Sequence, residues 1–354
     1  MNPENQSQPA PNPAPLVEVW RGPIVESRHR GHVAAVDGES RLVAYLGEPE
    51  TVTYLRSSGK PFQAVPLLTS GAAARFNFTE AELAVACGSH SGEDLHVETV
   101  ARMLEKIGLG EGDLKCGVHE PFDRVTAERL RSRGETPGVL RNNCSGKHTG
   151  MLALSRHLGA PPQLYDDPGG TVQQSILRAV SQFSGMDADE IALGTDGCGV
   201  PVFGMSVRAM ALMYARLVAP PEGFHAETRA ACARLTAAMS ARPELVGGTQ
   251  ERFDTEVMRA GRGLLISKIG AEGVYTAGVM PCERWPKGLG LAFKIEDGED
   301  RRARSTIAIE ALRQLDVLDE DAYKALLPYA SFPVQNHRGE KVGQIRASFQ
   351  LKSE

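Results

Sequence analysis

The sequence predicts a mixed α+β fold in which both chain ends form one antiparallel sheet around a helical middle region. Strand-like runs bounded by turn residues occur near both termini, whereas the middle of the chain has apolar residues at helical spacing. Strands grouped apart from helices, rather than alternating with them, are typical of α+β architecture. Of the 354 residues, 42% are hydrophobic and 23% charged, so the chain can bury a substantial core without disulfide or metal staples.

Five segments are expected to be strands. Gly38 marks a turn between the second and third of them, and Asn336–Gly339 supplies turn residues between the last two. A hairpin is therefore expected at each end of the chain. The five segments are Val17–Ile24, His32–Asp37, Leu42–Leu46, Tyr329–Gln335 and Gly343–Leu351.

The middle of the chain is expected to be helical. Pro61 stands in the first turn of its segment, where a helix tolerates proline. Thr79 followed by Glu82 has the spacing of a capping box. The predicted helices are Lys60–Ser70, Thr79–Cys87, Leu95–Ile107, Gly150–Leu158, Gly170–Phe183, Met205–Leu217, Glu227–Met239 and Ser305–Leu312.

The N-terminal segment differs in composition from the rest. Residues 1–15 are rich in proline, asparagine and glutamine and are expected to form a disordered tail. Residues 16–354 are expected to form one catalytic unit, whose division into subdomains the sequence does not mark. The tail lacks the basic start and apolar run of a signal peptide. No stretch approaches the ~20 apolar residues of a membrane span, so a cytoplasmic protein is expected.

Charge and cysteine content exclude several classes of protein. The formal net charge of −5 gives no electrostatic reason to expect nucleic acid or an anionic membrane as a partner. Six cysteines in a chain of this length do not make a disulfide scaffold. We expect free thiols, one or two of them chemically employed. The cysteines are Cys87, Cys116, Cys144, Cys198, Cys232 and Cys282.

Ser57 and Lys60 form the strongest local motif. A serine hydroxyl is a weak nucleophile until a base takes its proton, and a serine three residues before a lysine on a helical turn shares a face with it. A desolvated lysine, or one beside another cation, has a lowered pKa and can act as that base. Because four-residue patterns recur by chance, a capped helix start with a solvated lysine is the alternative interpretation.

A second serine and a second lysine follow this motif. Ser89 lies in the Gly-flanked turn 89–93, and Lys268 lies in the run 267–273, which is bounded by small residues. Their order parallels the Ser-x-x-Lys, Ser-Asp-Asn and Lys-Thr-Gly motifs of serine β-lactamases and penicillin-binding proteins. An N-cap would explain Ser89 alone, and a surface turn would explain Lys268 alone. The three motifs together favour an acyl-serine enzyme.

The run Asn142–Gly150 is the densest group of polar and sulfur side chains. Its Gly-Lys step suggests a P-loop, but Arg141 stands where that motif needs glycine, and His148 where it needs serine or threonine. Cys144 and His148, together with Cys198, could bind a zinc ion. The absence of a Cys-x-x-Cys pair favours two buried thiols instead.

Two polar residues near these cysteines are candidates for substrate binding. His148 is the histidine best placed to contact a ligand, although a hydrogen-bonding role without a ligand is also open. Asp196 lies between small residues and could accept a substrate ammonium, or it could cap its own turn.

With these motifs, the sequence resembles the rhizobial-type (class 3) L-asparaginase family, which is unrelated to the threonine-nucleophile bacterial asparaginases. The run Asn-Asn-Cys-Ser-Gly-Lys-His is highly specific, and the matches cover nearly everything after the N-terminal tail. Leu55 and Gly59 depart from the pattern, which has proline and alanine there; neither change removes a catalytic atom. The matching segments are Glu26–His32, Arg56–Gln63, Cys87–Glu93, Asn142–Gly150, Gly194–Pro201, Lys268–Gly273 and Val342–Arg346.

The resemblance implies a fold similar to serine β-lactamases and bacterial glutaminases, and a homodimer. It implies that Ser57 is the nucleophile with Lys60 as its paired lysine, and that Ser89 and Lys268 form a second pair beside them. It also implies a zinc site near the substrate, not needed for the chemical step, in which the lysine ligand must be deprotonated. The implied zinc ligands are Cys144, Lys147 and Cys198, and the implied substrate contacts are Arg56 and His148.

The function expected from these residues is hydrolysis of L-asparagine to L-aspartate and ammonia. Ser57, deprotonated by Lys60, would form an acyl-enzyme that water then hydrolyses. A glutaminase and a β-lactam-directed acyl-serine hydrolase of the same fold are the enzymatic alternatives. A non-catalytic amino-acid-binding protein is a third alternative, against which the presence of all four serine and lysine groups speaks.

Overall fold

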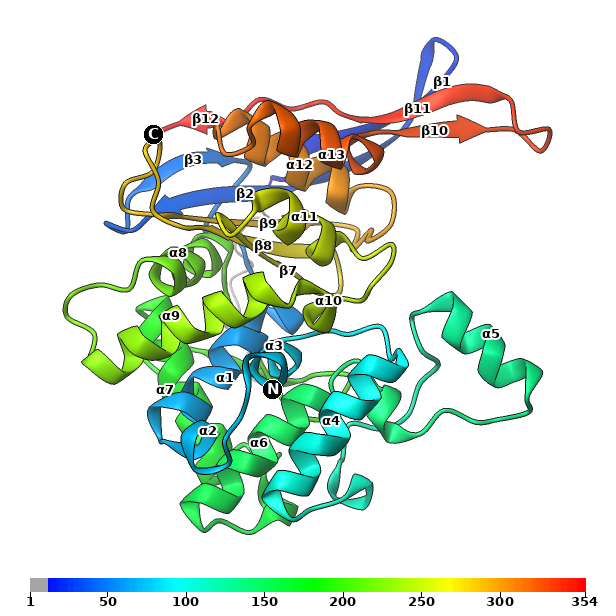
Figure 1. The fold of residues 1–354 in the computed structure, drawn as a ribbon. Coiled ribbons are helices and arrows are strands. Elements are labelled where there is room, and N and C mark those ends of the chain that lie inside the picture. The colour runs from blue at the N-terminus through cyan, green and yellow to red at the C-terminus, as the bar shows by residue number, and fades with distance from the viewer. Residues whose placement is uncertain (1–11) are drawn as a thin grey trace, which may run out of the picture.

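A large antiparallel sheet with helices on both faces is the main feature of the computed structural model, which describes residues 12–354 (Figure 1). Its longest strand is β2 (Ile24–Asp37). The first half of β2 pairs with β1 (Ala14–Arg21), and the second half lies between β3 (Leu42–Leu46) and β9 (Leu289–Ile295). With 14 residues at about 3.3 Å each, β2 is long enough to connect the two parts of the sheet.

Both ends of the chain lie in this sheet. β1 pairs antiparallel with β11 (Lys341–Ala347), so that Val17 stands opposite Ala347. β10 (Phe332–Gln335) borders β11, and β12 (Lys352–Ser353) pairs with β3. The predicted antiparallel sheet shared by the two chain ends, within a mixed α+β fold, is confirmed.

The other half of the sheet was not expected from the sequence. β7 (Leu265–Ile269), β8 (Val274–Val279) and β9 complete the order β10-β11-β1-β2-β9-β8-β7. Nearly every residue of these three strands is buried. Because both of their faces are covered, they lack the alternation of polar and apolar residues that marks a half-exposed strand.

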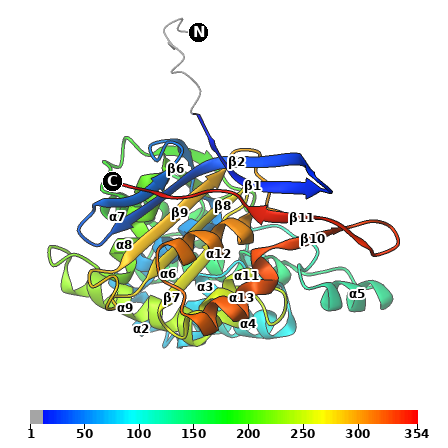
Figure 2. The same ribbon diagram turned by 90° about the horizontal axis from the view of Figure 1, so that it is seen from above.

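The sheet separates two hydrophobic cores. α8 packs against β2, β8 and β9 on one face, and α12 packs against β1 and β8 on the other. Figure 2 shows α12 and α13 lying over the sheet. Successive residues of β2 alternate between the cores: Val33 and Ala35 belong to one, Ala34 and Val36 to the other, as the two-residue period of a strand requires.

A group of helices lies on the α8 side, with α1 (Lys60–Thr69) at its centre (Figure 1). α1 contacts α6, α7 and α9, and only its last turn is not fully buried. A smaller sheet of order β4-β6-β5 lies beside it. The remaining helices are α2 (Ala72–Arg75), α3 (Glu80–Ala86), α4 (Asp94–Ile107), α5 (Arg124–Ser132), α6 (Ser145–Leu158), α7 (Thr171–Ser184), α8 (Val207–Val218), α9 (Ala226–Ala241), α10 (Pro243–Val246), α11 (Phe253–Gly261), α12 (Arg304–Gln314) and α13 (Glu320–Ala330). The remaining strands are β4 (Val52–Tyr54), β5 (Ala192–Thr195) and β6 (Pro201–Ser206), and the 3-10 turns are η1 (Arg56–Gly59), η2 (Glu111–Asp113), η3 (Val139–Arg141) and η4 (Pro162–Leu164).

Most predicted helices are found within a few residues of their expected bounds, and two boundaries matter for function. The predicted capping box of α3 is formed: the Thr79 N–H donates to Glu82 Oε2 at 2.7 Å, and the Glu82 N–H donates to Thr79 Oγ1 at 3.4 Å. α6 begins at Ser145 rather than Gly150, so Lys147 lies on a helix.

β1 begins at Ala14, inside the segment predicted as a disordered tail, and residues 1–11 of that segment lie outside those described. No helix of the described residues is long and apolar enough to span a membrane.

Candidate active site

Ser57 lies on η1, the short turn that runs directly into α1. Arg56, which begins this turn, has φ of +50°, a left-handed conformation that is uncommon for a residue with a Cβ. Such conformations persist where the surroundings impose them. Here Ser58 Oγ donates to the Lys268 carbonyl at 3.1 Å, and Tyr214 Oη donates to the Ser58 carbonyl at 2.8 Å. The turn that carries Ser57 is therefore fixed to both β7 and α8.

Lys60 is completely buried at the first position of α1. Its Nζ donates to Ser89 Oγ at 3.0 Å and to the carbonyls of Gly88 at 2.6 Å and Asn143 at 3.0 Å. Within the described residues, none of the three hydrogen bonds that Lys60 Nζ donates goes to Ser57. The lysine expected to contact Ser57 is thus bound to the second serine, because α1 leads its side chain into the helical layer while Ser57 stays half-buried.

Lys268 reaches the same serine from the opposite side. It is completely buried on β7, and its Nζ donates to Ser89 Oγ at 3.0 Å and to the Ile269 carbonyl at 3.0 Å. The carboxylate of Asp254, from α11, lies 3.4 Å from this nitrogen. The alternative of a surface turn for Lys268 is therefore wrong. Ser89 Oγ lies between two buried lysine nitrogens that are 208 positions apart in the sequence.

Burial changes the acidity of both lysines. It lowers the pKa of Lys60, although the neighbouring Cys144 and Cys198 act in the opposite direction. Burial also lowers the pKa of Lys268 to about 8, although the Asp254 charge acts in the opposite direction. The Lys60 charge also disfavours the charged form of Lys268. A neutral lysine amine, able to accept a proton from serine, is therefore accessible close to physiological pH.

A cavity of about 150 Å³ is lined by both Ser57 and Ser89. It is smaller than the ~300 Å³ at which drug-sized ligand pockets begin, which suits a small substrate. Arg252, Asp300 and Arg304 also line it. These three residues escaped prediction from the sequence, because isolated charged residues in loops and at helix starts carry no local signal of a shared site.

The predicted substrate-binding residues lie elsewhere. Arg56 Nε donates to Asp196 Oδ1 at 3.0 Å, and both side chains are mostly buried. His148 is completely buried on α6, with its Nδ1 2.7 Å from Tyr165 Oη, and burial lowers its pKa so that it is neutral. Neither the Arg56–Asp196 pair nor His148 is among the residues that line the Ser57–Ser89 cavity.

The three predicted zinc ligands are close together. Lys147 Nζ donates to Cys198 Sγ at 3.0 Å, and the hydrogen bond from the Cys198 thiol lowers the pKa of Cys144. Burial works to lower the pKa of Lys147, but the thiols and Asp196 together raise it. The segment that holds Cys144 and Lys147 packs tightly on α3: a Cβ at Gly146 would lie 2.4 Å from the Val85 carbonyl oxygen.

The donor set fits zinc under one condition. Thiolates are good zinc ligands, and Cys144 is readily ionised. In the described residues no group of three His, Cys, Asp or Glu side chains is arranged to hold a metal. Lys147 is therefore needed as a third ligand, and both its amine and the Cys198 thiol, whose pKa is raised by the hydrogen bond to Cys144 and by burial, must first lose a proton. In this structure Lys147 Nζ donates to Cys198 Sγ, and Cys144 is the one of the two thiols whose pKa is lowered.

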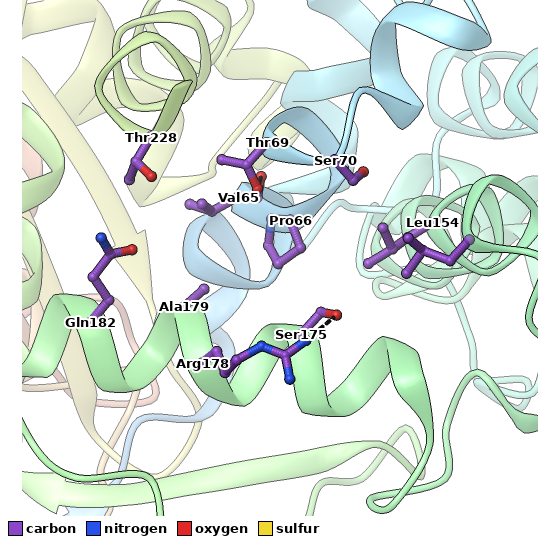
Figure 3. Close-up of a pocket in the computed structure, with 11 residues that line it drawn as sticks. Val65, Pro66, Thr69, Ser70, Leu154, Ser175, Arg178, Ala179, Gln182 and Thr228 are labelled. Atoms are coloured by element: carbon purple, nitrogen blue, oxygen red, sulfur yellow. Dashed lines mark hydrogen bonds between the residues drawn. The ribbon is translucent and has the colours of Figure 1, made fainter. Parts of the chain in front are cut away.

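A second cavity, of about 270 Å³, lies between α1, α6, α7 and α9 (Figure 3). Val65, Pro66 and Leu154 give it a largely apolar wall, and Arg178 donates to Ser175 Oγ at 3.0 Å on one side. None of the predicted site residues lines it, and among its described lining residues there is no lysine or histidine to act as a base. The candidate catalytic serines lie in the Ser57–Ser89 cavity instead.

Comparison with known proteins identifies the family of this chain. Residues 17–347 match the family described as L-asparaginase II. The chain therefore belongs to the L-asparaginase II family and is an amidohydrolase. No curated protein matches it significantly.

Distant likenesses to solved structures involve glutaminases. A probable glutaminase from Bacillus subtilis, complexed with 6-diazo-5-oxo-L-norleucine, shares 9% identity over 81% of this chain and 85% of its own, with a TM-score of 0.40. The Bacillus subtilis glutaminase YbgJ, in covalent complex with 5-oxo-L-norleucine, shares 11% identity over 85% and 93%, with a TM-score of 0.39. Mglu in its tris and glutamate form shares 12% identity over 83% of this chain and 61% of its own, with a TM-score of 0.45. Likenesses this distant support no conclusion about substrate.

Proposed function

We propose that this member of the L-asparaginase II family hydrolyses the side-chain amide of L-asparagine to L-aspartate and ammonia through an acyl-serine intermediate. The observation that supports it most is Ser89 Oγ, 3.0 Å from both Lys60 Nζ and Lys268 Nζ in a cavity shared with Ser57. Amide hydrolysis of this kind needs a hydroxyl nucleophile and a base. The cavity is lined by two serines, and two buried lysines of lowered pKa donate to the Ser89 hydroxyl.

Ser57 is assigned as the nucleophile because it is the more accessible of the two serines. Ser89 is only 3% exposed and its oxygen is occupied by two lysines. Ser57 Oγ attacks the amide carbon, and its proton passes to the Lys60 amine through the Ser89 hydroxyl. The lysine returns the proton to the leaving ammonia. Water, activated by the same groups, then cleaves the ester to release aspartate and free Ser57.

A diazomethyl ketone analogue of asparagine would distinguish the two serines. The reagent alkylates the nucleophile, and peptide mass spectrometry identifies the modified residue. We expect the label on Ser57, and Ser57→Ala protein to remain unlabelled. A label on Ser89 in wild-type protein would reverse the two assignments.

A zinc ion held by Cys144, Lys147 and Cys198 is proposed as an accessory to this site. When bound, zinc supplies a Lewis-acidic positive charge. The chain's own contribution is to keep Cys144 ionised and to bring Lys147 within 3.0 Å of Cys198 Sγ. The Arg56–Asp196 pair adjoins this cluster, since Asp196 Oδ2 lies 3.9 Å from Cys198 Sγ. A homodimer is also proposed, from the family resemblance, and light scattering on the purified protein would test it.

Ammonia release tests the substrate directly. Purified protein would be assayed with asparagine and glutamine in parallel, and with a chromogenic cephalosporin. We expect kcat/KM for asparagine to exceed that for glutamine and no turnover of the cephalosporin. A higher kcat/KM for glutamine would make the protein a glutaminase. No ammonia from either amino acid would refute the proposal.

A further inference from the structure

Arg304 and Asp300 form an ion pair in the wall of the Ser57–Ser89 cavity. Arg304 is the first residue of α12, and Asp300 precedes it by one helical turn's length in the connecting segment. Neither residue contacts the lysines or the thiol cluster described above through a hydrogen bond of the described chain. The pair therefore has no part in the acid–base chemistry and needs another explanation.

One hydrogen-bond donor of the Arg304 guanidinium has no partner among the described residues. The Arg304 side chain is 10% exposed, and this donor, Nε, is buried. A buried donor without a partner is unfavourable, so a polar ligand that contacts the guanidinium would offset this cost. Burial lowers the pKa of Arg304 only to about 10, so the guanidinium is charged at neutral pH.

Asp300 is both fixed and accessible. Its Oδ1 accepts the Gly273 N–H at 2.8 Å, which fixes the carboxylate against the turn between β7 and β8. Its side chain is 39% exposed. A carboxylate in this position can accept a cationic ligand at low cost, because water already reaches it.

Arg252, the other arginine of the cavity wall, is already engaged. Its guanidinium donates to the Ser89 carbonyl at 2.6 Å and to Ser91 Oγ at 3.3 Å, and lies over the Phe122 ring at 5.5 Å. These contacts hold the turn that carries Ser89. Arg252 is thus a positioning residue, and Arg304 is the cation available to a ligand.

The charges of the Arg304–Asp300 pair mirror those of a free amino acid. A zwitterion carries a carboxylate and an ammonium on one carbon, and the pair offers a guanidinium and a carboxylate side by side. A guanidinium binds a carboxylate through two parallel hydrogen bonds. Without substrate the two residues neutralise each other, and with it each exchanges one ionic partner for another.

We propose that Arg304 binds the α-carboxylate, and Asp300 the α-ammonium, of the amino-acid substrate. The side-chain amide then extends toward Ser57 and Ser89 in the same small cavity. The assignment deepens the proposed function and rests on it in taking an amino-acid amide as substrate. It makes Arg304 and Asp300 the residues that select an α-amino acid over other amides.

Three amides that differ by one charged group test this assignment. Asparagine carries both groups, 3-aminopropanamide lacks the α-carboxylate, and succinamate lacks the α-ammonium. Their kcat/KM values and calorimetric Kd values would be compared in wild type, Arg304→Gln and Asp300→Asn. Arg302→Gln, an exposed arginine two residues from Arg304, is the matched control. Thermal melting would establish that each variant is folded.

The two variants should lose different preferences. We expect wild type to prefer asparagine over each analogue by about 10- to 100-fold, the range for a hydrogen bond to a charged group. Arg304→Gln should lose the preference over 3-aminopropanamide and keep most of that over succinamate. Asp300→Asn should do the reverse, and Arg302→Gln should match wild type. Because Asp300 is half-exposed, its variant tests the idea even if Arg304→Gln does not fold.

The outcomes separate this assignment from the proposed function. Turnover of asparagine with unchanged preferences in both variants would overturn the assignment alone. No turnover of asparagine, but amino-acid binding whose analogue preferences follow Arg304 and Asp300, would overturn the proposed function alone. Absence of both turnover and amino-acid binding in wild type would overturn both.

Discussion

Lys60 and Lys147 occupy similar places in the fold but opposite chemical surroundings. Both lie in the first turn of a helix, α1 and α6 respectively, and are at most 3% exposed. Lys60 donates to two carbonyls and a hydroxyl, and burial lowers its pKa even though Cys144 and Cys198 act to raise it. Lys147 faces two thiols and Asp196, and its pKa is raised. Burial at a helix N-terminus favours the neutral amine in both, but anionic partners outweigh this at Lys147.

Lys268 lies between these two cases. It shares Ser89 Oγ with Lys60, but it also has the Asp254 carboxylate 3.4 Å away. Burial still dominates and brings its pKa to about 8. The three lysines show that partners, rather than depth alone, decide whether a buried lysine is a base or a fixed cation. Lys60 and Lys268, which contact Ser89 at the Ser57–Ser89 cavity, are the lysines of lowered pKa, whereas Lys147 in the thiol cluster stays charged.

Removal of the nucleophile should have the largest effect. Ser57→Ala leaves the lysine pair intact but has no oxygen to accept the acyl group, so kcat should fall by roughly 10⁴-fold or more. Ammonia release from asparagine measures it, with circular dichroism to confirm folding. Ser132→Ala, at an exposed serine of α5 that does not line the cavity, is the control. Near-wild-type turnover by Ser57→Ala would promote Ser89 to nucleophile.

Matched substitutions of Lys60 and Lys147 test whether these two lysines have different roles. Lys60→Met keeps much of the side-chain volume but cannot accept a proton, so kcat should fall by about 10²- to 10⁴-fold. Lys147→Met should change KM more than kcat, because this lysine is an ion-pair partner outside the acid–base path. If both variants lose kcat equally, the two clusters form one catalytic unit and the distinction made above is wrong.

Loss of the two thiols should affect affinity rather than chemistry. We expect wild type to bind about one zinc per chain, as measured by elemental analysis, and Cys144→Ser/Cys198→Ser to bind none. The double variant should keep activity at saturating asparagine, with KM raised by about 10-fold. Cys232→Ser, a buried thiol on α9, is the control. If purified wild type contains no metal and binds no zinc when zinc is added, the thiols are structural. If the double variant folds but is as inactive as Ser57→Ala, zinc takes part in the chemical step.

The pH profile should show the smallest change in activity, and it tests most specifically which lysine controls the rate. Lys268, with a pKa of about 8, is charged below that pH and donates to the Ser89 oxygen that must receive the Ser57 proton on its way to Lys60. We therefore expect kcat/KM to rise about tenfold per unit toward pH 8 and then level off. The Asp254 charge raises this pKa, so Asp254→Asn should move the rise toward acid by about one unit. Glu256→Gln, on the same helix but paired with Arg259, should leave the profile in place. A flat profile between about pH 6 and 9 would argue against a lysine base.

Much of the site could be predicted from local sequence. The Ser57–Lys60 spacing, the Asn142–Gly150 run and the strands at both ends follow from turn chemistry and periodicity over a few residues. Proximity of Cys144, Lys147 and Cys198 was expected from the family resemblance, and the structure brings them together. Their binding of zinc stays a prediction.

The partners of the buried charges were decided only by the tertiary structure. Lys60 donates to Ser89 rather than to its sequence neighbour Ser57, and Lys268 reaches the same oxygen across 179 positions. β7, which carries Lys268, escaped prediction because both of its faces are covered and its sequence has no two-residue alternation. Arg304 lines the cavity although its helix, α12, packs on the face of the sheet opposite to α8. Local sequence determined which groups capable of catalysis are present; packing across the sheet determined which of them meet, and the burial that follows sets their charge.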